Sequence, residues 1–378
     1  MTAFTWNQVL RFRAARHFLN RPASTGEKGV AATVSALGGI QAQVMSAGEL
    51  QLWARLDDLK AGEVDAMLWQ NRSLVKTWAM RGTLHLLTAE DLPVYVAAMQ
   101  STRNMYRKQY WLKAFGTDLE EIEAIIAAVY TVLDGKTLSR EELAEDIVKV
   151  AKVPHQRDRL RSGWGEFLKL ASYHGYLCFG PSQGQNVTFV RPDQWIAGWR
   201  EVDPDEAMRT IGRRYFAAYG PSPRDEFSHW WGIQGAEGRH WLKVLEDELV
   251  EVDVEGWKGW LLRADVDAVQ SASEDSSVRL LPNFDTFTLT AYHERNLLLA
   301  EDLLPRIYRK AGWISPVIVV DGRIQGVWKY EQKRKQIQVS IEPFTEFSAS
   351  VKEGVEVEAA RLGGFLGAPV EISFKAVG

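Results

Sequence analysis

The sequence predicts an α+β fold, in which three tandem modules of helices and a hairpin precede a C-terminal domain of short strands. In residues 1–115 three helical segments are followed by a β-hairpin. The same order of elements recurs, with negligible identity between the copies, in residues 116–205 and 206–270. Residues 271–378 alternate short strands with tight turns, so we expect a small β-barrel-like domain or a strongly curved sheet there. Three helices followed by a hairpin is the order of a winged helix-turn-helix module.

The first module is predicted mainly from periodicity. Apolar residues recur at helical spacing in residues 6–18, 29–37 and 46–59. Two strand-like runs follow at residues 74–80 and 83–87, joined by a turn at Arg81-Gly82. We therefore expect a wing hairpin after the third helix and a short helical piece near residues 64–69.

The second and third modules follow the same order more loosely. Ser139 and Glu142 predict a capping box that opens a helix, and residues 175–191 predict a hairpin with a polar tip at residues 182–186. In the third module, strands at residues 249–254 and 257–262 turn at a Glu-Gly pair. The spacing of three tryptophans predicts that they lie in the core: Trp164, Trp230 and Trp231.

The C-terminal domain begins after a run rich in Ser, Glu and Asp at residues 271–277. The expected strands are residues 278–281, 286–292, 316–320, 323–330, 336–342 and 370–374. One helix is expected between the last two strands, at residues 350–363.

Composition excludes several classes of protein. The chain has 378 residues, 46% hydrophobic and 25% charged, as in an ordinary soluble globular protein. The N-terminus lacks a signal-peptide pattern, and no apolar run has the length of a membrane span, so we expect a cytoplasmic protein without membrane contact. A single cysteine, Cys178, excludes an intrachain disulfide, and the seven histidines show no metal-ligand spacing. We expect no metal, no cofactor and a monomer.

The charge is distributed unevenly along the chain. Residues 1–115 hold 14 Lys and Arg against 8 Asp and Glu, whereas residues 116–240 hold 15 against 19 and residues 241–378 hold 16 against 22. The basic N-terminal third is compatible with a polyanionic partner.

The most informative stretch is a short loop in this basic third. Gly38-Gly39 is predicted to end the second helix, and Ser46-x-x-Glu49 reads as a capping box that opens the third. Between them lie two glutamines, Gln41 and Gln43. In an extended segment, side chains at positions i and i+2 share a face, so both amides could address one ligand.

Two amides suggest a restricted chemistry. An amide does not gain or lose a proton near neutral pH, so it cannot be an ordinary general acid or base. It can hold a water molecule or direct its dipole at a developing positive charge, which suits a reaction with an already activated leaving group. The alternative is that Gln41 and Gln43 only satisfy backbone groups of the loop. Glu49, the nearest carboxylate, is expected to be occupied as a cap.

At this point the chain resembles a known family, the AlkZ-like winged-helix DNA glycosylases, which include the YcaQ group. The resemblance covers essentially the whole chain and rests on four segments in the same order: Gln41-Ala42-Gln43, Arg81-Gly82-Thr83-Leu84-His85, Leu280-Leu281-Pro282-Asn283-Phe284-Asp285, and residues 319–328. It implies three tandem winged-helix modules wrapped around DNA and a C-terminal β-barrel. It also implies hydrolysis of the N-glycosidic bond of alkylated purines, with interstrand crosslinks unhooked by some members.

The family's catalytic motif is Gln-aliphatic-Gln in the AlkZ branch and Gln-aliphatic-Asp in the YcaQ branch. By this resemblance Gln41 and Gln43 are the catalytic residues, and the amide at position 43 places the chain on the AlkZ side. The carboxylate mechanism of the other branch cannot be carried over. An alkylated, cationic purine leaves without a proton donor, so placing a water molecule near the anomeric carbon is the remaining task.

Double-stranded DNA with alkylated bases is therefore the expected partner. The third helix carries several acidic residues, which makes it a poor recognition helix and favours a role as scaffold for the glutamines. The candidate DNA-binding residues are Arg11, Arg13, Arg16, Arg81, Thr83, His85, Arg157, Arg159, Arg161, Gln183, Gln185 and Asn186. For each arginine the alternative interpretation is a solvated surface charge. For His85 it is a hydrogen bond to the backbone, and for the polar hairpin tip it is a plain surface turn.

The leading hypothesis is a monofunctional DNA glycosylase that hydrolyses the bond through a water molecule held by Gln41 and Gln43. The alternative is a non-catalytic winged-helix DNA-binding protein, such as a regulator or lesion sensor. A glycosidase acting on another nucleoside or sugar is a third, more distant reading. Which adduct is the substrate does not follow from the sequence.

Overall fold

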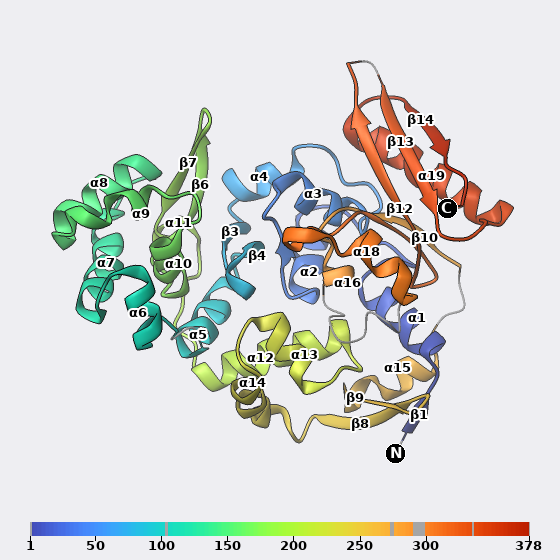
Figure 1. Cartoon of the computed structure of the whole chain (residues 1–378), viewed down its shortest axis with the longest axis horizontal. Helices are drawn as coiled ribbons and strands as arrows, with labels where there is room; N and C mark the ends of the chain where they lie inside the picture. The colour runs from blue at the N-terminus through green and yellow to red at the C-terminus, as the bar shows by residue number, and fades with distance from the viewer. Residues whose placement is uncertain (1, 103–104, 273–275, 290–298, 335, 378) are drawn as a thin grey trace. The chain divides into compact units, whose positions relative to one another are not determined.

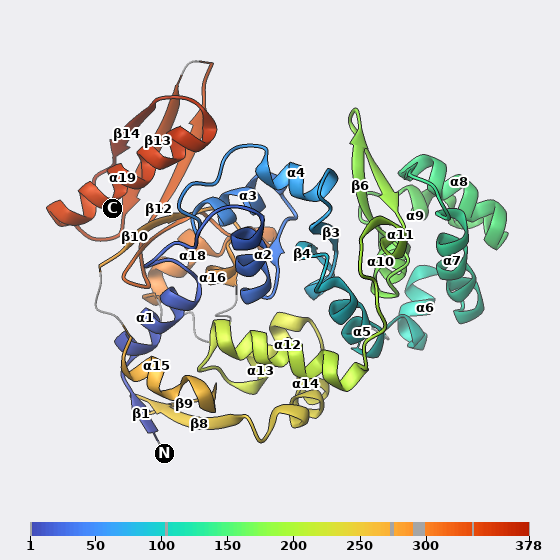
Figure 2. The ribbon, with the colours of Figure 1, turned by 180° about the vertical axis from the view of Figure 1, so that it is seen from behind.

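The chain has a mixed α+β fold that divides into two compact units. The computed structural model describes residues 2–102, 105–272, 276–289, 299–334 and 336–377. Unit 1 consists of Met1–Glu63, Arg213–Trp230 and Leu245–Gly378, and unit 2 of Val64–Gly212 and Trp231–Val244. Figures 1 and 2 show the elements from opposite sides.

Unit 1 begins with the helices that flank the glutamine loop. They are α1 (Trp6–Arg16), α2 (Glu27–Ala36) and α3 (Met45–Trp53), with the short strand β2 (Ile40–Gln41) between the last two. Thr5 and Gln8 form a capping box that opens α1. The first two helices thus form close to the expected ranges, whereas α3 ends at Trp53, six residues before the expected end at Leu59.

A three-stranded sheet in unit 1 joins the chain's N-terminus to a distant hairpin. Its strands are β1 (Thr2–Phe4), β8 (Leu249–Val254) and β9 (Trp257–Leu262), and β1 runs parallel to β8. Phe4 and Val252 lie in one apolar cluster with residues of α1 and of α15 (Val266–Gln270). The sequence predicts the hairpin but not β1, because pairing across about 250 residues leaves no local signal.

The C-terminal strands of unit 1 form one open sheet. Its strand order is β10 (Val278–Leu281), β11 (Val317–Val320), β12 (Arg323–Gln332), β13 (Ile337–Pro343) and β14 (Val370–Phe374). Neighbouring strands are antiparallel except β13 and β14, which are parallel. Helix α19 (Ala349–Leu366) connects these two and lies along the sheet (Figure 1), where it buries Val355, Ala359 and Leu362.

Two expectations for this domain need correction. Within the described residues no pairing joins β10 to β14, so the structure has an open mixed sheet and no closed barrel. Part of the strand expected at residues 286–292 is the short helix α16 (Thr286–Leu289), and its other residues lie outside the described ones. The reason is local, because the Asp285 side chain accepts a hydrogen bond from the Phe287 N–H and caps a helical turn.

Unit 2 contains two hairpins that pack on each other. One is formed by β3 (Leu74–Trp78) and β4 (Leu84–Thr88), and the other by β6 (Cys178–Gln183) and β7 (Asn186–Val190), with β5 (Leu138–Ser139) paired to β7. Figure 2 shows β3 beside β6. The Trp78 and Phe179 rings meet between them at a centroid distance of 4.9 Å. Both hairpins are confirmed.

Helices surround these hairpins, and Ser139 and Glu142 cap α8 reciprocally, as predicted. The helices that lie wholly within unit 2 are α5 (Leu92–Thr102), α6 (Gln109–Phe115), α7 (Leu119–Val132), α8 (Arg140–Ala151), α9 (Arg157–Arg161), α10 (Glu166–Tyr173), α11 (Pro192–Trp195) and α14 (Gly235–Trp241). Three helices extend over a boundary between the units in sequence, α4 (Glu63–Trp69), α12 (Pro204–Tyr219) and α13 (Arg224–Trp231), and a further short helix of unit 1 is α18 (Leu304–Ile307).

Two further details differ from the predictions. Trp230 and Trp231 are buried, but Trp164 is 78% exposed, because it lies in a loop before α10 and not on the helical face that its spacing suggested. Helix α3 begins at Met45 with Val44 as N-cap residue and no side-chain cap, so the capping box expected at Ser46 and Glu49 is absent. The Val44 carbonyl already accepts from the N–H groups of Ala47 and Gly48, which leaves Ser46 inside the first turn.

None of the helices in the described ranges combines the length and the hydropathy that a membrane span requires.

Candidate active site

The loop with the two glutamines starts where α2 ends. Gly38 and Gly39 have positive φ angles of 72° and 98°. The Gly38 N–H donates to the Ser35 carbonyl and the Gly39 N–H to the Val34 carbonyl. This is the hydrogen-bond pattern of a helix terminated by glycine, so the glycine pair ends α2 as predicted.

The two amides lie in different surroundings. Gln41 belongs to β2 and is 6% exposed, whereas Gln43 follows the strand and is exposed. Ala42 between them is fully buried. A buried amide keeps one orientation, and an exposed amide can reach a bound molecule. The pair therefore combines a fixed group with an accessible one.

Helix α3 packs closely on this loop. A Cβ atom at Gly48 would lie 3.2 Å from the Ala42 Cβ and 3.5 Å from the Gln41 carbonyl oxygen. Only small residues allow this approach, which explains the Ala at position 42 and the Gly at position 48. The loop and the first turn of α3 thus form one packed unit.

A buried ion pair connects α3 to the C-terminal domain. The Arg55 guanidinium donates through both Nη atoms to the Asp285 carboxylate at 2.7 Å, and both side chains are 0% exposed. Arg55 also donates to the Gln51 carbonyl. Asp285 is the last residue of the Leu280-to-Asp285 segment noted above, so this motif supports the helix that packs on the glutamine loop. The sequence alone assigns Arg55 no role at this site, because its partner lies 230 residues away.

Glu49 does not form the expected capping box, since α3 begins at Met45 without a side-chain cap. It is half-buried on α3. Burial, together with the negative charge of Glu49, raises the pKa of the Tyr330 hydroxyl, so the carboxylate lies within electrostatic reach of β12.

The arginines of α1 are largely engaged within unit 1. Arg13 is buried and donates through Nη2 to the Pro221 carbonyl at 2.5 Å and through Nε to the Gly220 carbonyl at 3.5 Å. Arg16 forms an ion pair with Asp265 while its side chain stays 39% exposed. Arg11 is half-buried. This geometry favours a structural role for Arg13 and leaves Arg16 the more accessible of the two.

The wing candidates lie at the turn between β3 and β4. Arg81 occupies a left-handed conformation, with φ 55°, in the turn of Met80–Gly82. Thr83 donates its hydroxyl to the Met80 carbonyl. His85 is buried, and its Nδ1 lies 3.0 Å from the Thr83 carbonyl oxygen. Of the two interpretations of His85, the hydrogen bond to backbone is the one that the structure shows.

The alternating arginines of α9 face acidic residues of α8. Arg157 and Arg161 pair with Glu145, and Arg161 also pairs with Glu141. Arg159 lies over the Phe115 ring at 5.4 Å. Their side chains remain partly exposed, so the pairs do not prevent a contact with phosphate, but part of their charge is already neutralised.

The polar hairpin tip of unit 2 is fully accessible. Gln183 ends β6, Asn186 begins β7, and both are exposed together with Gln185. Gly184 has a φ of 62°, which allows the tight turn. The side chains of this tip are exposed to solvent, whereas the Arg13 guanidinium is buried against two backbone carbonyls.

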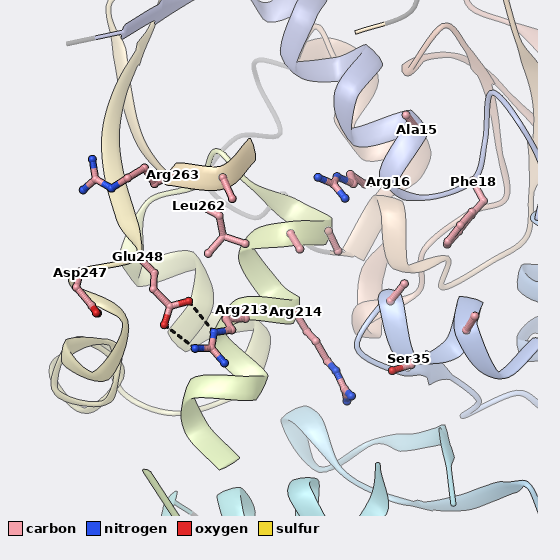
Figure 3. Close-up of a pocket in the computed structure, with 15 residues that line it drawn as sticks. Ala15, Arg16, Phe18, Ser35, Arg213, Arg214, Asp247, Glu248, Leu262 and Arg263 are labelled. Atoms are coloured by element: carbon pink, nitrogen blue, oxygen red, sulfur yellow. Dashed lines mark hydrogen bonds and ion pairs between the residues drawn. The ribbon is translucent and has the colours of Figure 1, made fainter. Parts of the chain in front are cut away.

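A cavity of about 950 Å³ lies elsewhere in unit 1 and does not include either glutamine. Alanines of α1, α2 and α12 form much of its wall (Figure 3). Arg213 makes two hydrogen bonds to Glu248 in this lining, and Arg16, Arg214 and Arg263 line the cavity as well. Two of the four arginines are thus paired with carboxylates, Arg213 with Glu248 and Arg16 with Asp265. No metal-binding group of three or more His, Cys, Asp or Glu is found in the described residues.

Comparison with known proteins shows to which class of protein this chain belongs. A model of the family described as DNA glycosylase AlkZ-like matches residues 34–365. The interstrand DNA cross-link repair glycosylase of Streptomyces sahachiroi is 35% identical over 376 residues, which are 97% of this chain and 99% of that protein. The solved structure of Streptomyces sahachiroi DNA glycosylase AlkZ matches with a TM-score of 0.87 over 99% of this chain and all of that chain.

The chain is therefore a DNA glycosylase, an enzyme that acts on DNA. It belongs to the AlkZ-like family, as its motifs suggested. This membership confirms the resemblance. It argues against the non-catalytic alternative, because the family and the relative are described as glycosylases.

Proposed function

We propose that this glycosylase hydrolyses the N-glycosidic bond of alkylated, cationic purines in double-stranded DNA, with Gln41 and Gln43 positioning the attacking water. The observation that carries the proposal is the contrast within the pair, since a buried amide at Gln41 stands two residues from an exposed amide at Gln43. Gln41 supplies a fixed dipole, and Gln43 reaches the substrate.

The chemistry needs no proton donor for the leaving group. A purine alkylated on a ring nitrogen carries a positive charge, which is neutralised when the bond to the sugar breaks. The sugar then develops positive charge at its anomeric carbon. Amide oxygens directed at that carbon stabilise the charge and accept hydrogen bonds from the water that adds to it. The added water gives up one proton to the solvent to leave the neutral sugar, so neither step changes the protonation of an amide.

Interstrand crosslinks are the second proposed substrate. The Streptomyces relative, similar over nearly the whole of both chains, is named as an interstrand DNA cross-link repair glycosylase. A purine tethered through an alkylated ring nitrogen presents the same cationic leaving group as a purine with a small alkyl group. Hydrolysis of its glycosidic bond would release one strand from the other.

DNA binding is proposed to use winged-helix modules. We keep as a proposal the four domains expected from the sequence, residues 1–115, 116–205, 206–270 and 271–378, the first three as tandem winged helices. The hairpin tip and the partly exposed Arg16, Arg81, Thr83, Arg157, Arg159 and Arg161 would contact the backbone or the minor groove. The protein is proposed to act as a monomer.

The test is a glycosylase assay. Purified protein is incubated with a duplex containing one 7-methylguanine and, separately, with a crosslinked duplex, and alkaline cleavage then reveals abasic sites. We expect abasic sites with the wild type, and a loss of about 100-fold to 1,000-fold in single-turnover rate for Gln43→Ala. DNA affinity should change little. Full excision by Gln41→Ala and Gln43→Ala would refute the assigned roles.

A further inference from the structure

The backbone of the glutamine loop is held at two points by buried side chains. The Tyr219 hydroxyl, from α12, donates to the Leu37 carbonyl at 2.9 Å. The Gln51 amide, from α3, donates through Nε2 to the Gln41 carbonyl at 2.9 Å. Both donors are buried. Leu37 is the residue at which α2 ends, so its carbonyl lacks the helical partner that carbonyls earlier in the helix have.

The orientation of the Gln51 amide is itself determined. Its Nε2 faces the Gln41 carbonyl, and its Oε1 accepts a hydrogen bond from the Thr286 N–H at 3.2 Å. Exchanging the amide oxygen and nitrogen would place two acceptors and two donors against each other. Thr286 directly follows Asp285, whose buried pair with Arg55 holds this segment against α3.

We infer that Gln51 and Tyr219 are positioning residues of the glycosylase reaction. They hold the backbone carbonyls of Gln41 and Leu37 and thereby set the direction in which the Gln41 and Gln43 side chains leave the loop. This inference rests on the proposed function, since it takes the two glutamines to be catalytic. The Gln41 carbonyl belongs to the peptide plane that leads into Ala42, so its hydrogen bond to Gln51 fixes that plane. A displacement of about 1 Å in a reacting group can cost about 100-fold in rate.

The decisive variant is Gln51→Glu, because its hydrogen bonding changes with pH. A protonated carboxyl group can donate to the Gln41 carbonyl and accept from the Thr286 N–H, as the amide does. An ionised carboxylate has no donor and repels the Gln41 carbonyl oxygen. We expect single-turnover excision of 7-methylguanine from a duplex to approach the wild-type rate at low pH and to fall by at least about tenfold as the carboxyl ionises.

The readout is the ratio of the variant rate to the wild-type rate at each pH, after subtraction of spontaneous depurination. Circular dichroism at each pH shows whether the variant is folded. Gln51→Met, which has neither donor nor acceptor, should be slow at every pH. A Gln51→Glu ratio that stays constant with pH in folded protein would overturn the inference.

A second pair of variants does not depend on a buried carboxyl group. Tyr219→Phe removes the hydroxyl that holds Leu37. Tyr215→Phe is the matched control, because it removes a buried hydroxyl one turn earlier in α12, which bonds to the Ser222 hydroxyl at 2.8 Å. We expect slower excision with unchanged DNA affinity only for Tyr219→Phe, although both variants should lose similar stability.

The outcomes separate this inference from the proposed function. If Gln41→Ala and Gln43→Ala lose excision while Gln51→Met and Tyr219→Phe keep it, only the positioning roles are refuted. If Gln41→Ala and Gln43→Ala excise at the wild-type rate, the catalytic assignment fails first. Equal rates for Tyr219→Phe and Tyr215→Phe would refute the role of Tyr219.

Discussion

Two polar regions of this chain, both rich in amides, differ in how their groups are held. The glutamine loop of unit 1 lies against buried Gln51 and Tyr219, and each of these donates to one of the loop's carbonyls. The hairpin tip of unit 2 carries its amides, among them Gln183 and Gln185, on a two-residue turn that is open to solvent.

This difference reflects two kinds of task. A buried polar group must find its partners within the protein, and satisfying all of them leaves one geometry. An exposed amide is satisfied by water and can exchange it for an acceptor on a ligand. A hydrolysis without a proton donor depends on geometry, whereas contact with DNA of variable sequence benefits from adaptable groups.

The strongest test of the buried region is Asp285→Ala. It leaves the Arg55 guanidinium buried without its partner, so we expect the free energy of unfolding to fall by about 3–5 kcal/mol. Urea denaturation measures the change. Replacing both residues, with Arg55→Met added, should recover much of the loss, and an equally unstable double variant would show that the charge was not the cause.

Acid sensitivity offers a second test of the same region. His17 is buried, and burial, followed by the charges of Arg55 and Arg13, holds its pKa well below the ordinary value. The folded protein therefore keeps His17 neutral while the unfolded chain takes up a proton below about pH 6.5, so stability falls as the pH is lowered through that value.

The measurement for His17 is the urea midpoint at about pH 7.5 and about pH 5.5, on either side of the ordinary histidine pKa. His17→Phe keeps an aromatic ring beside Tyr219 and Phe287. We expect a smaller difference between the two midpoints in the variant than in the wild type. The same difference in both proteins would mean that His17 does not contribute.

The exposed region should respond in the opposite way. Replacing Gln183, Gln185 and Asn186 together by Ala should change the free energy of unfolding by about 0.5 kcal/mol or less, because these groups are already in water. DNA affinity should fall by about tenfold or less, since a few hydrogen bonds are lost. Fluorescence anisotropy with a labelled duplex measures it. An unchanged DNA affinity would show that the hairpin tip is a surface turn that does not contribute to DNA binding.

The smallest effect is expected at Glu49. If the amides do the chemistry, Glu49→Gln should keep single-turnover excision within about twofold, a difference of less than 1 kcal/mol in activation free energy. A loss of more than 100-fold, measured on the same 7-methylguanine duplex, would transfer the chemistry from the amides to a carboxylate.

Much of the local structure was predictable from the sequence. The glycine pair ends α2, Ser139 and Glu142 cap α8, and the hairpins form where turn residues separate strand-like runs. These features depend on hydrogen bonds between residues a few positions apart, so the residue types there are sufficient to predict them. At Ser46 the local prediction was wrong, because α3 begins one residue earlier, at Met45, and Ser46 lies inside its first turn.

By itself, the sequence determined most of the element order, the position of Gln41 and Gln43 between two helices, and the family. Only the tertiary structure decided what holds that loop. Arg55 pairs with Asp285 across 230 residues, and Tyr219 reaches Leu37 across 182. Neither partner carries a local signal, because a polar side chain is satisfied equally well by water until folding buries it, and the chain fold then selects the one group that can replace that water.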